Sequence, residues 1–104
     1  MTDEDRQKVL DSVRSTTLDK VVITHGTDTI HKTAETLSAV KGKTVVLTGA
    51  MLPEKFKDSD ADFNLGMAVC AVRNLPHGIY IALYGEVKLW NEFKLSNASD
   101  AQEN

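Results

Sequence analysis

The sequence is poor in cysteine, proline and aromatic residues, and it has no long apolar run. Its single cysteine, Cys70, cannot form an internal disulfide, so the chain is not a disulfide scaffold and we expect a reducing, cytoplasmic location. No apolar run approaches the roughly 18 residues that a membrane span needs. The acidic start MTDEDRQ does not resemble a signal peptide either. We therefore expect no membrane partner.

Basic residues are also too few for a nucleic-acid surface. The 12 Lys and Arg are scattered among 15 Asp and Glu, the formal net charge is −3, and no basic stripe forms. With 104 residues, 41% of them apolar, the chain is long enough for one small domain with a single core. We expect a domain over residues 1–90 with a polar tail over 91–104, and no nucleic-acid partner.

Short runs rich in β-branched residues recur along the chain. Those over residues 20–24, 44–48 and 79–84 are typical of strands buried on both faces, and a shorter strand-like segment covers 87–90. Segments with helical spacing lie between the runs. This alternation predicts a three-layer α/β fold with a parallel sheet and right-handed crossovers.

Three segments show helical spacing. Residues 3–15 follow an N-cap candidate, Thr2, and begin with three acids, which the helix dipole favours in a first turn. The second helix carries apolar residues at Ile30, Ala34, Leu37 and Val40. The third follows a polar loop over 49–61, and we predict that its buried face comprises Phe63, Met67, Cys70 and Asn74.

A short polar motif, HGTDT over residues 25–29, follows the first predicted strand. Its glycine permits a tight turn, and its hydroxyls and carboxylate lie beside the free N–H groups of a helix start. Loops at the carboxyl ends of neighbouring parallel strands meet, so we expect this motif beside the 49–61 loop. Such a place suits the binding of an anion or the orientation of a nucleophile, and Asp28 is suited to hold a substrate ammonium. The plainer alternative is that Thr27 or Asp28 only caps a helix.

Metal and nucleotide sites have little support in the sequence. The three histidines have no Cys or His partner at zinc-ligand spacing. The acidic run 58–62 resembles the start of a calcium loop, but the required Gly and Glu are replaced by Phe63 and Val69. The loop after the first strand has one glycine and therefore no nucleotide-binding pattern. We predict no metal and no cofactor, and we interpret Cys70 as a core residue.

Three segments together resemble one enzyme family. VVITHGTDTIHKTAETL, TVVLTGAMLP and SDADFNLGMAV occur in the order found in the N-terminal domain of bacterial-type L-asparaginases, and the likeness covers roughly residues 2–90. The short, single-domain members are the most similar. The resemblance implies a Rossmann/flavodoxin-like fold, a homo-oligomer and an amino-acid amide as substrate. The implied reaction is hydrolysis of L-asparagine, or of L-glutamine, through a threonine acyl intermediate.

The resemblance also assigns roles to individual residues. Thr27 matches the family's second active-site threonine, which helps to position or activate the attacking group together with a lysine. Asp28 matches the aspartate that holds the substrate's α-amino group, and Gly26 belongs to the same substrate-binding loop. Lys94 is the best match for the family lysine, and Lys88 is the alternative.

Two parts of the family pattern have no match in these 104 residues. They are a strand ending in T-G-G-T-I, whose threonine is the primary nucleophile, and a serine that grips the substrate carboxylate. We therefore expect a domain that lacks its first strand, with the edge of residues 21–23 exposed and able to pair in an oligomer. The alternative to an enzyme is a catalytically incomplete module that binds an amino acid or assembles with a partner.

Overall fold

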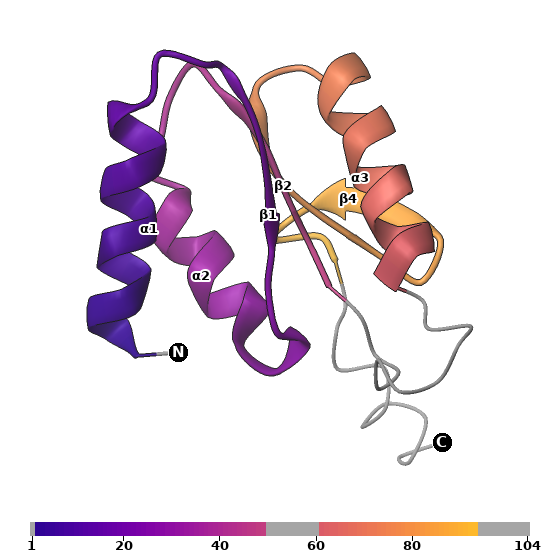
Figure 1. Ribbon diagram of the computed structural model, residues 1–104, viewed down its shortest axis with the longest axis horizontal. Helices are drawn as coiled ribbons and strands as arrows, with labels where there is room; N and C mark the ends of the chain where they lie inside the picture. Colours follow the sequence, from indigo (N-terminus) through magenta and orange to yellow (C-terminus); the bar gives the residue numbers. More distant parts are fainter. Residues whose placement is uncertain (1, 50–60, 94–104) are drawn as a thin grey trace.

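The computed structural model describes residues 2–49 and 61–93, which form a sheet with helices on both faces (Figure 1). The strands and helices confirm the predicted α/β fold, and none of the helices in these ranges is long and apolar enough to cross a membrane. In chain order the elements are α1 (Asp3–Ser15), β1 (Lys20–Thr24), the 3₁₀ turn η1 (Thr27–Thr29), α2 (Ile30–Leu37), β2 (Thr44–Thr48), α3 (Ala61–Asn74), β3 (Gly78–Leu83) and β4 (Glu86–Leu89).

The sheet has the strand order β1-β2-β3-β4, and its first three strands are parallel. The expectation of a wholly parallel sheet is wrong at β4, which pairs antiparallel with β3. The reason is a tight turn at Tyr84 and Gly85, whose φ angles of 58° and 75° are both positive. Such turns match the twist of two adjacent antiparallel strands, so β3 ends at Leu83 and the chain folds straight back.

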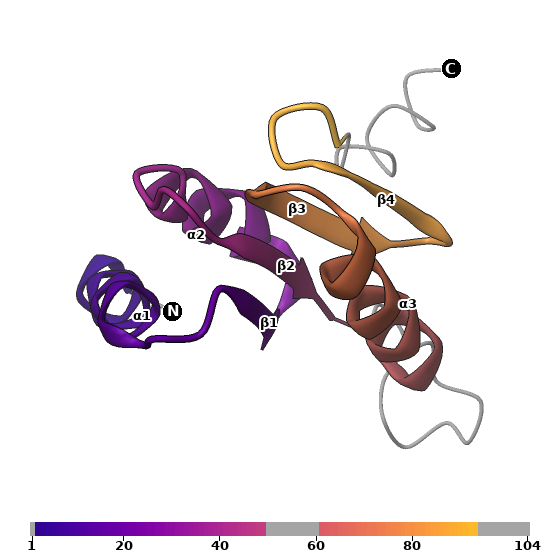
Figure 2. The same cartoon turned by 90° about the horizontal axis from the view of Figure 1, so that it is seen from above.

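Helices α1 and α2 lie on one face of the sheet, and α3 lies on the other (Figure 2). Alternate strand residues divide between the two faces: Val45 and Ile81 belong to the cluster under α2, whereas Val46 and Tyr80 belong to the cluster under α3. The central strand β2 is buried along its whole length. The predicted three-layer arrangement is therefore confirmed.

The two helical crossovers have opposite hands. The chain steps from β1 to β2 and from β2 to β3 in the same direction across the sheet, but α2 and α3 cover opposite faces. Figures 1 and 2 show the β1–α2–β2 unit as right-handed and the β2–α3–β3 unit as left-handed. The expectation of right-handed crossovers is wrong for the second unit, which departs from a rule that parallel connections almost always obey.

Helix α3 turns a different side to the sheet from the one predicted. Phe63 is 64% exposed and Cys70 is exposed, whereas Asn64, Ala68 and Val72 are buried. Apolar residues occupy more than one side of this helix, so spacing alone did not identify the buried side. Small side chains are buried because they let the helix approach the sheet closely, and Cys70 is not a core residue.

The start of α1 is capped as the sequence indicates. The Thr2 hydroxyl accepts a hydrogen bond from the Asp5 backbone N–H, and the Thr2 backbone N–H donates to the Asp5 carboxylate, both over 3.1 Å. The hydrogen bond from the Thr2 backbone, followed by the one from the Thr2 side chain, lowers the pKa of Asp5 below its ordinary value.

Candidate active site

The ends of β1 and β2 meet closely at one edge of the sheet. The His25 backbone N–H donates to the Thr48 carbonyl over 2.8 Å, which continues the pairing of the two strands by one residue. A Cβ atom on Gly49 would lie only 2.2 Å from the His25 carbonyl oxygen and 3.4 Å from the Thr27 methyl carbon. The predicted meeting of the two loops is confirmed at Gly49; the rest of the second loop, residues 50–60, lies outside the described residues.

The His25 ring stabilises the turn that carries the polar motif. Its Nδ1 lies 2.6 Å from the Gly26 carbonyl oxygen, and its Nε2 lies 2.7 Å from the Thr33 hydroxyl on α2. A carbonyl can only accept, so Nδ1 donates, and in the neutral ring Nε2 accepts from Thr33. The imidazole therefore ties the start of the turn to the helix that follows it.

Thr27 and Asp28 form the start of η1, immediately after this bend. The cap positions belong to other residues, Gly26 for η1 and Thr29 for α2, and neither makes a side-chain cap hydrogen bond. Thr27 is half-buried and Asp28 is exposed. Neither side chain hydrogen-bonds to another residue within 2–49 and 61–93. The cap positions thus contradict the capping alternative for Thr27 and Asp28.

The two candidate lysines differ in how far the structure describes them. Lys88 lies on β4, at the opposite edge of the sheet from β1, with its ammonium 3.9 Å from Glu86. Three strand spacings separate β4 from β1, or about 14 Å, so Lys88 is not brought to the Thr27 turn. Lys94 lies outside the described residues.

Phe93, the residue before Lys94, is described and lies close to the start of α2. Phe93 is buried, its ring stacks on Tyr84 at a centroid distance of 6.4 Å, and its carbonyl oxygen lies 2.7 Å from Nε2 of His31. His31 is in the first turn of α2, three residues after Asp28. The described chain therefore ends beside the start of α2.

Sequence reasoning missed one residue that shapes this edge. Asn64 is 1% exposed, and its side-chain amide donates to the Gly49 carbonyl over 2.7 Å. This bond fixes the point at which the chain leaves β2 and passes the His25 turn. The sequence did carry a signal for it, an asparagine among apolar residues early in α3. A buried side-chain amide needs a hydrogen-bond partner, so such a residue indicates a specific contact.

The site thus places the Thr27 hydroxyl and the Asp28 carboxylate at a strand-to-helix turn. The close approach of Gly49 to His25 holds this turn against the end of β2. No cluster of three or more metal-ligating side chains occurs among the described residues.

A model of the family described as "Asparaginase, N-terminal" matches residues 1–102. The chain belongs to the asparaginase family. This membership agrees with the HGTDT turn and with the α/β fold that presents it.

Asparaginase relatives from several organisms are similar to this chain. An L-asparaginase of Thermococcus kodakarensis is 43% identical over 74 residues, which are 68% of this chain and 23% of the relative. A glutaminase-asparaginase of Acinetobacter glutaminasificans is 42% identical over 65 residues, which are 61% of this chain and 20% of that protein.

Solved asparaginase structures share the fold. The thermostable L-asparaginase from Thermococcus kodakarensis has a TM-score of 0.78 at 37% identity, covering 86% of this chain and 29% of that one. L-asparaginase I from Vibrio cholerae has a TM-score of 0.78 at 32% identity, covering 88% and 30%. The chain therefore spans less than a third of the length of each of these relatives.

Proposed function

We propose that this chain acts as an amidohydrolase on a small amino-acid amide, converting L-asparagine, or L-glutamine, and water to the corresponding acid and ammonia. The observation that carries the proposal is the placement of Thr27 and Asp28 together just after β1, with neither side chain hydrogen-bonded to another residue within 2–49 and 61–93. Membership of the asparaginase family, and relatives named L-asparaginase and glutaminase-asparaginase, support the choice of substrate class.

Asp28 binds the substrate's α-ammonium group in this proposal. A hydrogen bond between two ionised groups is roughly twice as strong as one between neutral groups, so a single exposed carboxylate can orient a zwitterion. Gly26 precedes both groups with an ordinary extended backbone (φ −68°, ψ 144°) and nothing within 4 Å of a Cβ atom placed there, so the turn does not depend on the conformational freedom of glycine at this position.

In this proposal the Thr27 hydroxyl oxygen itself attacks the amide carbon, because the threonine that the family uses as primary nucleophile has no match in these residues. A hydroxyl is a weak nucleophile until a base removes its proton, and Lys94, as a neutral amine, is the proposed base. An oxygen–carbon bond then forms, the carbon–nitrogen bond breaks and ammonia leaves with the transferred proton. Water hydrolyses the resulting acyl ester and restores the hydroxyl.

The test is ammonia release from L-asparagine by the purified 104-residue chain. Thr27→Ala and Asp28→Ala are each expected to lower the rate by about 10²–10⁴-fold, the range typical of acid–base and binding groups in active sites. Thr29→Ala is the matched control, because Thr29 lies in the same turn and makes no side-chain cap hydrogen bond. Release that survives both test substitutions in a folded chain contradicts the proposal.

A second candidate is amino-acid binding without turnover. It is favoured by one observation: within the described ranges no hydrogen bond joins the Thr27 hydroxyl to a base, and the His25 imidazole is bonded to Gly26 and Thr33. Calorimetric titration with L-aspartate separates the two candidates. Binding that Asp28→Ala abolishes, in a chain that releases no ammonia, supports the binding module.

A further inference from the structure

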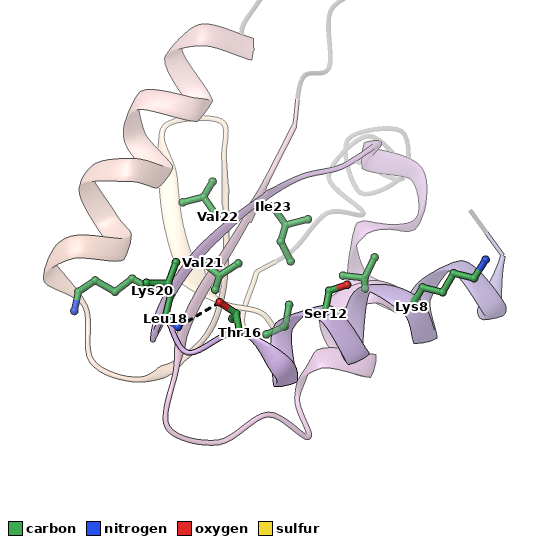
Figure 3. Close-up of a pocket in the computed structure, with 10 residues that line it drawn as sticks. Lys8, Ser12, Thr16, Leu18, Lys20, Val21, Val22 and Ile23 are labelled. Carbon is green, nitrogen blue, oxygen red and sulfur yellow. Dashed lines mark hydrogen bonds between the residues drawn. The ribbon is translucent and has the colours of Figure 1, made fainter.

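Two hollows in the described surface differ in their lining. The first lies between α1 and β1 and is walled by apolar side chains, including Val21 and Ile23 (Figure 3). It follows the outer edge of β1, where the asparaginase family has a further strand, so we assign it no ligand. The second combines cationic and apolar side chains, which is the lining expected of a site for a small molecule.

The second hollow, which we call the amino-edge cavity, lies at the amino-terminal ends of β2 and β3. It has a volume of about 300 Å³ and is lined by residues between 38 and 43, by 77–79 and by 89–91. Thr27 follows the carboxyl end of β1, so the length of a five-residue strand, about 16 Å, separates the two places. The amino-edge cavity is therefore distinct from the candidate active site.

Backbone hydrogen bonds hold the walls of the amino-edge cavity together. The Gly78 N–H donates to the Lys43 carbonyl over 2.9 Å, and the Trp90 N–H donates to the Ile79 carbonyl over 2.9 Å. Gly42 has a φ angle of 75°, which few other residues adopt, so the turn before β2 is tight. The cavity is therefore a fixed part of the fold.

The polar lining of this cavity is cationic, although the chain as a whole is acidic. Lys41, Lys43 and His77 line it and no Asp or Glu does, whereas the chain carries 15 acids against 12 Lys and Arg. The Lys43 ammonium donates to the carbonyls of Thr16 and Leu18 over 2.8 and 2.6 Å. The exposed Lys41 ammonium makes no hydrogen bond or ion pair within residues 2–49 and 61–93. Of the two lysines, Lys41 is therefore the one suited to bind an anion.

The apolar lining lies partly open to solvent. Leu89 is 38% exposed and Trp90 is half-buried, so a ligand that covers them removes apolar area from water. The His77 Nε2 lies 3.6 Å from the Asp19 carboxylate, which leaves Lys41 as the stronger attraction for an anion. A cation beside an apolar wall suits a ligand that is both anionic and apolar, and the volume is at the lower end of the range for ligand pockets.

We propose that the amino-edge cavity binds a small organic anion. Its flat apolar body lies against Leu89 and the Trp90 indole, and its charged group is bound by the Lys41 ammonium. A carboxylate and a phosphate monoester share this chemistry, and the first test below distinguishes them. The proposal does not depend on turnover at Thr27, because the two places lie at opposite ends of the strands.

The first test uses Trp90, which is the only tryptophan of the chain. In the isotope-labelled chain its indole N–H gives one nuclear magnetic resonance signal, which should shift when phenylacetate or phenyl phosphate is added. For ligands of roughly ten non-hydrogen atoms, we expect a dissociation constant of about 1 mM or lower with at least one of the two. Phenylacetamide has the ring without the charge and acetate has the charge without the ring, so each should bind at least about fivefold more weakly. No shift with either aromatic anion, or equal binding of phenylacetamide, overturns the proposal.

The second test removes the charge from the cavity. Lys41→Gln should weaken the aromatic anion that binds by about three- to tenfold and leave phenylacetamide unchanged, since only the anion pairs with the ammonium. The matched control is Lys32→Gln, because Lys32 is also exposed but does not line the cavity, and it should change the affinity by less than about twofold. A Lys41→Gln chain that binds the anion normally contradicts the proposal.

The third test removes part of the apolar wall. Leu89→Ala should weaken the anion at least about threefold, because less apolar surface is covered on binding. Leu65→Ala on α3 is the matched control, since Leu65 is 40% exposed against 38% for Leu89 and lies outside the cavity, and it should leave the affinity unchanged. Asp28→Ala should also leave it unchanged. Normal binding by Leu89→Ala, or loss of binding in Asp28→Ala, would place the anion elsewhere and overturn the proposal.

Discussion

The two faces of the sheet are built differently. Under α1 and α2 the core includes large, fully buried side chains such as Ile30 and Leu37, and it extends to Phe93. Under α3 the buried set is small and includes Ala68 and Ala82, while Phe63 on the outside of the helix is 64% exposed. Because burial of apolar area drives folding, the α2 face provides most of the stability. The α3 face instead positions the candidate site, since the Asn64 side chain on this helix donates a hydrogen bond to the Gly49 carbonyl.

The largest expected effect tests this difference with the same substitution on both faces. Leu37→Ala removes a fully buried side chain on α2 and should lower the free energy of unfolding by about 2–5 kcal/mol. Leu65→Ala on α3 removes a side chain that is 40% exposed and should cost about 0.5 kcal/mol or less. Urea unfolding measures both, and equal costs would remove the distinction between the faces.

The next effect compares two glycines. Gly49→Ala should destabilise by about 3 kcal/mol, because its Cβ would lie 2.2 Å from a backbone oxygen that cannot move aside easily. Gly66→Ala on α3 meets no atom within 4 Å and should stabilise by about 0.5–1 kcal/mol, the difference in helix propensity. Thermal unfolding should therefore move in opposite directions, and a shift in the same direction would contradict the close contact at Gly49.

A third comparison concerns two asparagines of α3. Asn64→Ala leaves the Gly49 carbonyl without its buried donor and should cost about 1–3 kcal/mol, with weaker binding of L-aspartate. The matched control is Asn74→Ala, whose exposed amide donates to the Cys70 carbonyl over 2.8 Å, and it should cost less than about 0.5 kcal/mol. Calorimetry would refute the positioning role if Asn64→Ala bound the ligand as well as the parent.

The smallest effect is at the exposed start of α1. Since the pKa of Asp5 is lowered in the folded chain, its contribution to stability is present above the ordinary value of 3.8 and is lost as the pH falls through the folded pKa. Asp3 behaves in the same way, because the Arg6 guanidinium hydrogen-bonds to it and lowers its pKa. The melting temperature should fall slightly between about pH 5 and pH 2, and Asp5→Asn should reduce that fall. An identical fall in both chains would show that the capping box is not responsible.

Local signals predicted the elements well, and long-range packing decided the rest. The runs at 20–24 and 44–48 matched β1 and β2 in full, because β-branched runs have few alternatives in a buried sheet. The buried side of α3 was mispredicted, since both Phe63 and Ala68 are apolar and only the close approach to the sheet selects the smaller one. The left-handed crossover depends on which face α3 covers, and no spacing in the sequence encodes that choice.

The site was predicted in part for the same reason. Gly26, Thr27 and Asp28 are contiguous, so a local motif identified them and placed them after a strand. The contribution of Asn64 depends on a carbonyl 15 residues away, and that of His31 on one 62 residues away. Such pairs become visible only when the chain is folded.

Because backbone groups alternate in direction along β1, neighbouring amides of this strand should differ in their rates of hydrogen exchange. The amides of Val21 and Ile23 point toward β2, so they should exchange slowly, together with the fully buried strand beside them. The amides of Val22 and Thr24 point away from β2, where no strand of residues 2–49 and 61–93 lies, and should exchange faster than those of Val21 and Ile23. Slowly and rapidly exchanging amides thus alternate on one strand. The ratio of their exchange rates reports whether the outer edge of β1 is paired with another strand in solution.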